Sequence, residues 1–114
     1  MGDQRLSAKA RSLMEDARVQ KLLSTASIWE MAIKTSLGKL NLEEPFATLI
    51  PQQISVNGIE VLSIQFPHLM SVAQLPFHHR DPFDRLLIAQ AKMEGLTVIG
   101  NDSAWDAYEV ARAW

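Results

Sequence analysis

The 114-residue sequence contains no cysteine, which excludes disulfide bonds and every zinc site built on thiolates. It also lacks a run of about 20 apolar residues, the length that a membrane-spanning helix needs. The first eleven residues, MGDQRLSAKAR, contain charges and no apolar core, unlike a secretory signal. These absences predict a cytoplasmic protein that does not enter a membrane.

An excess of one charge is missing as well, because the formal net charge is -2 at pH 7. This value argues against bulk attraction to nucleic acid but leaves room for a local basic patch. Apolar residues make up 47% and charged residues 21%, as in ordinary soluble globular proteins. The chain has no repeats or linker and is long enough for one core, so we expect a single domain over residues 1–114.

Short apolar segments alternate with helical patterns, which is typical of a parallel sheet covered by helices. We expect strands over residues 19–23, 59–64 and 96–99, and an edge strand in the tail after residue 108. Helices are expected over residues 7–17, from Ser27 to near Gly38, over 46–55 with a break near Pro51, over 70–75, over 82–94, and after residue 102. The helix over 82–94 has the clearest ends, with Asp81 before it, Pro82 first and Gly95 just after it.

Three carboxylates share a position at the junction between a strand and a helix: Glu30, Asp84 and Asp102. In a parallel α/β sheet these junctions all lie at the carboxyl ends of the strands, where sites form. Carboxylate oxygens suit Mg²⁺ or Mn²⁺. We therefore predict that the three acids converge on a hard cation.

A purely structural interpretation of the same acids stays open. Ser27 and Glu30 have the spacing of a capping box, and Asp84 is favourable in a first helical turn. The pairs Glu30–Lys34 and Asp81–Arg85 have the spacing of ordinary helix-surface ion pairs. Only the recurrence of an acid at three equivalent junctions favours the metal site.

Basic and aromatic residues flank the acidic positions. Four of them are candidate contacts for RNA phosphates, with a solvated surface as the alternative: Lys34, His79, Arg80 and Arg85. Adjacent histidines such as His78 and His79 point to opposite faces of an extended chain, so a zinc site is not expected. The aromatic residues recur at helical spacing and are interpreted as core: Trp29, Phe83, Trp105 and Tyr108.

The segments ASIWEMAIKTSLGKL, HHRDPFDRLLIAQA and VIGNDSAWDAY closely resemble the PIN-domain family, specifically the VapC-type toxins of bacterial toxin–antitoxin pairs. The resemblance implies an α/β fold of three layers, with a mostly parallel sheet flanked by helices. It also implies a Mg²⁺- or Mn²⁺-dependent endoribonuclease that hydrolyses RNA phosphodiester bonds, a VapB-type antitoxin as partner, and a homodimer. Residue by residue, it assigns metal-binding and catalytic roles to Glu30, Asp84 and Asp102.

One departure from the family pattern concerns the start of the chain. The family begins with an apolar central strand that ends in a metal-binding Asp, whereas this sequence begins with MGDQRLSAKA, which resembles the segment after that strand. Asp3 cannot be equated with that ligand, so we expect the first strand and one acid to be missing. The alternative function is then a non-catalytic remnant that keeps only antitoxin binding or dimerisation. A nucleotide-binding module is disfavoured because no glycine-rich phosphate motif is present.

Overall fold

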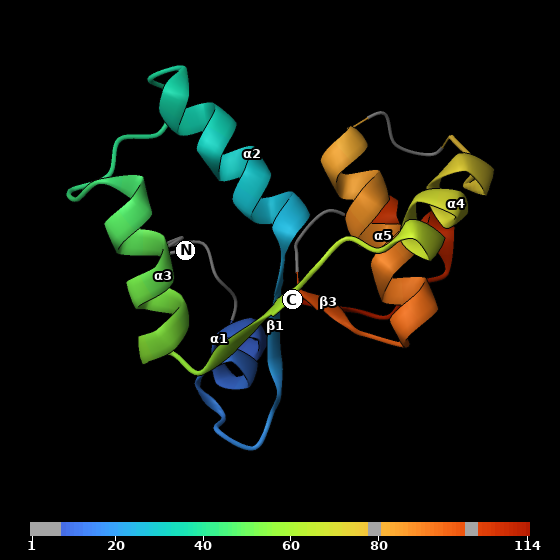
Figure 1. Cartoon of the computed structure of the whole chain (residues 1–114). Coiled ribbons are helices and arrows are strands. Elements are labelled where there is room, and N and C mark those ends of the chain that lie inside the picture. Colours follow the sequence, from blue (N-terminus) through green and yellow to red (C-terminus); the bar gives the residue numbers. More distant parts are fainter. Residues whose placement is uncertain (1–7, 78–80, 100–102) are drawn as a thin grey trace. The chain divides into compact units, whose positions relative to one another are not determined.

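Helices and short parallel strands alternate along the chain in a computed structural model that describes residues 8–77, 81–99 and 103–114 (Figure 1). The elements, in order, are α1 (Ala8–Glu15), β1 (Lys21–Ser24), α2 (Thr25–Ser36), α3 (Phe46–Val56), β2 (Ile59–Leu62), α4 (Phe66–Gln74), α5 (Pro82–Glu94), β3 (Val98–Ile99), the 3₁₀-helix η1 (Ser103–Tyr108) and β4 (Arg112–Ala113). They fall into two compact units, a smaller one of residues 20–64 and a larger one of residues 1–19 and 65–114.

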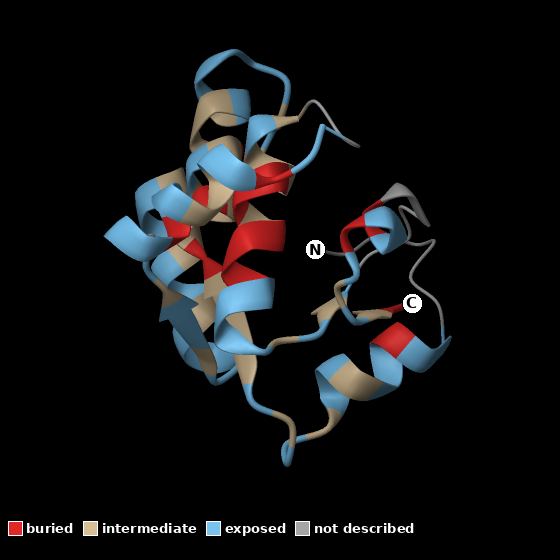
Figure 2. Cartoon of the chain, turned by 90° about the vertical axis from the view of Figure 1, so that its right-hand side faces the viewer, coloured by how far each residue is buried: buried red, intermediate tan, exposed pale blue. Residues whose placement is uncertain are grey.

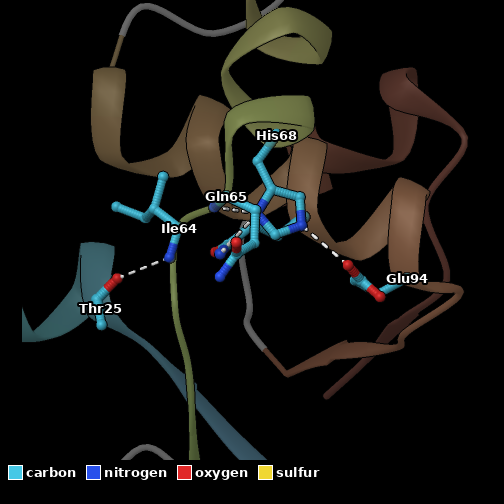
Figure 3. Close-up of polar contacts among 6 residues, drawn as sticks. Thr25, Ile64, Gln65, His68 and Glu94 are labelled. Carbon is cyan, nitrogen blue, oxygen red and sulfur yellow. Dashed lines mark hydrogen bonds and ion pairs between the residues drawn. The ribbon is translucent and has the colours of Figure 1, made fainter.

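The smaller unit is organised around two parallel strands. β1 pairs with β2 from Lys21 opposite Ile59 to Ser24 opposite Leu62, and α2 and α3 form the connection between them. α2 follows β1 without a loop (Figure 1). The hydroxyl of Thr25, the first residue of α2, accepts a 3.1 Å bond from the backbone N–H of Ile64, just beyond β2 (Figure 3). The start of α2 is therefore anchored to the end of the neighbouring strand.

Two expectations about the helices of the smaller unit are wrong. Ser24 caps α2 instead of Ser27, with its hydroxyl accepting a 3.0 Å bond from the N–H of Ala26. Strand pairing keeps the chain extended as far as Ser24, and the helix starts one residue later. α3 continues through Pro51 without a break, so the loss of one N–H donor is tolerated at this position.

The larger unit contains the main hydrophobic core. Buried residues gather on α5, which alone contributes six of them (red in Figure 2). The core cluster combines α5 with the end of α4 and with η1: Leu75, Ile88, Ala89, Trp105 and Tyr108. β3 pairs with β4 in parallel, with Val98 opposite Arg112 and Ile99 opposite Ala113. The expected edge strand in the tail is thereby confirmed.

A buried histidine explains why α4 begins earlier than expected, at Phe66 instead of residue 70. His68 is only 1% exposed, and its Nδ1 accepts a 2.9 Å bond from the N–H of Gln65, the residue that caps α4 (Figure 3). Because Nδ1 is an acceptor, the ring hydrogen lies on Nε2, which donates to the Glu94 carboxylate 2.9 Å away on α5. This cap uses none of the residue types that usually signal a helix start.

The expected α/β class and the parallel pairing of strands are confirmed. In the part of the chain that the structure describes, both strand pairs are parallel, and they form two separate sheets of two strands each. None of the described helices is long and apolar enough to cross a membrane.

Candidate active site

Glu30 is the sixth residue of α2, where its side chain is half-buried. Because the helix begins at Thr25, Glu30 lies beyond the first turn, and the expected capping box with Ser27 is wrong. The expected ion pair with Lys34 is present, with 3.5 Å between Lys34 Nζ and Glu30 Oε2. Helix capping therefore does not account for this carboxylate.

Asp84 is the third residue of α5, close to the positive end of the helix dipole. The cap itself is Asp81, whose Oδ1 accepts bonds from the N–H groups of Phe83 at 2.9 Å and Asp84 at 3.2 Å. The expected order of Asp81, Pro82 and Gly95 around this helix is confirmed, with Gly95 in the left-handed conformation at φ 65°. The capping role thus belongs to Asp81, and Asp84 supplies a second, half-buried carboxylate to the same turn.

Three of the predicted site residues, His79, Arg80 and Asp102, lie outside the described residues. Glu30 belongs to the smaller unit and Asp84 to the larger one, so the clustering of the three acids stays a prediction. Among the residues that the structure describes, no three His, Asp or Glu side chains are grouped closely enough to hold a metal ion.

The expectation that Arg85 contacts RNA needs correction. Arg85 is 7% exposed, and its guanidinium donates hydrogen bonds to the carbonyl oxygens of Val72, Leu75 and Pro76. The expected ion pair between Asp81 and Arg85 is also wrong, because the guanidinium points to these carbonyls. Sequence spacing predicted a surface cation at Arg85. The residue is buried because its guanidinium binds carbonyls at the end of α4.

The aromatic residues divide between core and surface. Trp105 and Tyr108 are buried, as expected, and Phe83 is half-buried. Trp29 is 56% exposed, so its assignment to the core is wrong. Helical spacing alone did not distinguish this exposed aromatic residue from the buried ones.

The donor chemistry of the described acids fits a hard divalent cation. Glu30 and Asp84 both provide partly exposed carboxylates, which are the oxygen ligands that Mg²⁺ and Mn²⁺ prefer. The basic side chain that contacts Glu30, Lys34, is itself exposed and adds positive charge beside the carboxylate.

Comparison with known proteins identifies the family of the chain. The family model described as PIN domain matches residues 1–111 and so spans both units. A curated relative, Ribonuclease VapC16 of Mycobacterium tuberculosis, is 41% identical over 60 residues, which are 53% of this chain and 43% of the relative. No solved structure matches the chain. The match over residues 1–111 confirms the expected family: the chain belongs to the PIN-domain family.

Proposed function

We propose that the protein is a metal-dependent endoribonuclease of the VapC type. The observation that carries this proposal is the PIN-domain match over residues 1–111, supported by the 41% identity to a VapC ribonuclease over 60 residues. The partly exposed carboxylates of Glu30 and Asp84, neither of which is the cap of its helix, support it further.

In the proposed site, Glu30, Asp84 and Asp102 hold Mg²⁺ or Mn²⁺. A bound ion of this kind supplies an activated water and neutralises charge on the phosphate. Asp81 accepts the N–H bonds at the start of α5, which leaves the ligand role in that turn to Asp84. Lys34 holds the Glu30 carboxylate at 3.5 Å and adds positive charge beside it.

The proposed partners follow from the same family relationship. Lys34, His79 and Arg80 contact the RNA backbone. Arg85 is buried and does not take part. A VapB-type antitoxin inhibits the enzyme, the toxin forms a homodimer, and both act in the cytoplasm. The homodimer is tested by light scattering, which should give twice the mass of the chain.

The decisive test of the function is RNA cleavage with Mg²⁺ as the sole metal, compared between the natural chain and Asp84→Asn. Asn keeps the size of Asp but removes the anionic ligand, so we expect activity to fall at least about 100-fold, more than the loss of an outer-shell group causes. Asp16→Asn is the matched control, because Asp16 binds Arg18 on the surface. It should leave cleavage unchanged.

Two results would contradict this proposal. Full cleavage by Asp84→Asn would show that the carboxylate serves only the helix. Absence of cleavage by the natural chain, combined with retained binding of a VapB-type antitoxin, would favour the non-catalytic alternative.

A further inference from the structure

The end of α4 leaves several backbone carbonyls in need of donors. The last four carbonyls of any α-helix have no partner within the helix. α4 ends at Gln74, and Pro76 follows soon after, so the chain can offer no N–H at that position. The N–H of Leu75 reaches one of these carbonyls, the oxygen of Val72, at 3.2 Å. The carbonyls of Leu75 and Pro76, which directly follow the helix, take their donor from another element.

Arg85 of α5 supplies that donor. Its Nη1 donates to the carbonyl of Pro76 at 2.8 Å, and its Nη2 donates to Val72 at 3.1 Å and to Leu75 at 3.3 Å. The ring of Phe77 lies against the guanidinium, with 4.2 Å from Cζ to the ring centroid. One side chain therefore binds the end of α4 and the two residues that follow it.

The chemistry of this contact requires arginine. A planar guanidinium presents several N–H groups in a fixed fork, which matches a set of carbonyls that lie side by side. The positive charge is buried, and it lies at the negative end of the α4 dipole. A lysine ammonium keeps the charge but cannot reach the same carbonyls in the same plane, and its stronger hydration opposes burial.

Arg85 also belongs to the first turns of α5, so its side chain connects that part of the helix to the end of α4. Arg85 follows Asp84 directly, and its own N–H donates to the carbonyl of Asp81 at 3.0 Å. Asp81 in turn accepts the N–H of Asp84. The turn that carries Asp84 is thus held by two attachments, the Asp81 cap and the Arg85 guanidinium.

We propose that Arg85 is a positioning residue of the ribonuclease, which holds the end of α4 to the first turn of α5 and thereby sets the position of the Asp84 carboxylate. This inference rests on the proposed function, since it gives Asp84 the role of a metal ligand. Arg85 itself touches neither metal nor substrate in this proposal.

The test compares Arg85→Lys with the natural chain by amide hydrogen exchange and by the affinity for Mn²⁺ alone. We expect the variant to remain folded, with faster exchange, by about 10-fold, at the bonded amides of Leu75, Phe83 and Asp84. The Mn²⁺ dissociation constant should rise about 10-fold, as for the loss of a group that orients a ligand. Arg18→Lys is the matched control, because Arg18 is an exposed arginine bonded to Asp16. It should change neither quantity.

The outcomes separate this inference from the proposed function. If the natural chain does not bind Mn²⁺, the proposed function fails and this inference fails with it. If the natural chain binds Mn²⁺ and Arg85→Lys binds equally well, only the positioning role is overturned, whatever happens to the melting temperature.

A second variant keeps the test decisive if Arg85→Lys does not fold. Phe77→Leu removes the ring over the guanidinium, and Phe77 is 84% exposed, so the core stays intact. We expect a smaller effect in the same direction, with exchange at Leu75 about 2- to 5-fold faster, as the loss of an exposed cation–π contact predicts. Unchanged exchange at Leu75 and unchanged Mn²⁺ affinity in Phe77→Leu would overturn the proposal.

Discussion

At the scale of single residues, hydrogen bonds show which acids stabilise the fold. Asp81 accepts two backbone N–H groups, and Glu94 accepts a bond from the ring of His68. Asp106 binds Arg112 through both oxygens, at 2.9 and 3.0 Å. The hydrogen bonds of these three carboxylates stabilise the fold, whereas Glu30 and Asp84 cap no helix.

The bidentate pair of Asp106 and Arg112 gives a prediction about pH. The hydrogen bonds from Arg112, together with its charge, lower the pKa of Asp106 below its ordinary value. A lowered pKa in the folded state stabilises the fold above the unfolded-state pKa, and this contribution disappears as the pH falls through the lowered pKa. In Arg112→Gln we expect the pKa of Asp106 to rise toward its ordinary value, measured by an NMR titration of the carboxyl carbon.

The control for this titration is Arg18→Gln, which removes a similar arginine from Asp16 and leaves Asp106 untouched. The pKa of Asp106 should not move in that variant. An unchanged pKa of Asp106 in Arg112→Gln would mean that the pair does not form in solution.

At the scale of elements, the sequence predicts the ends of a helix best where residues next to those ends determine them. The limits of α5 follow from Asp81, Pro82 and Gly95, and the structure has the helix at the predicted residues. The start of α2 was placed three residues late, because Ser24 and Ser27 are equally good caps and only the pairing of β1 with β2 favours Ser24. The start of α4 depends on His68, which is not one of the usual capping residues and so gave no signal in the sequence.

The cap of α5 provides a prediction that separates Asp81 from Asp84. Asp81→Ala removes the acceptor of two N–H groups, so we expect the free energy of unfolding to fall by about 0.5–2 kcal/mol. Asp81→Asn keeps a side-chain oxygen at the same position and should cost less. Urea unfolding of both variants measures the difference. Equal losses in the two variants would show that charge, and not the cap bonds, determines the effect.

The burial of Arg85 marks a limit of sequence reasoning at this scale. Helical spacing made Arg85 a partner of Asp81 on the surface, because the sequence does not show which backbone groups lack donors. The structure shows that α4 ends beside α5, and that carbonyls at this end accept hydrogen bonds from the Arg85 guanidinium. Trp29 is the opposite case, since an apolar residue at core spacing is 56% exposed.

At the scale of the whole molecule, one family model spans two compact units. Within each unit, the strands that pair follow one another along the chain, β1 with β2 and β3 with β4. The α/β class and the parallel pairing could therefore be predicted from alternating patterns. The convergence of the acids stays a prediction from their equivalent positions in the sequence, because Glu30 and Asp84 belong to different units.

The central claim is that Glu30, Asp84 and Asp102 hold one divalent cation. Paramagnetic broadening of backbone amide signals by Mn²⁺, below one equivalent, tests this claim most directly, with Mg²⁺ as the diamagnetic control. We predict that the signals of all three residues and their immediate neighbours broaden together, while those of Asp16 and Glu60 stay sharp. Broadening at only one of the three acids, or equally at Asp16 and Glu60, would contradict a shared metal site and the ribonuclease mechanism built on it.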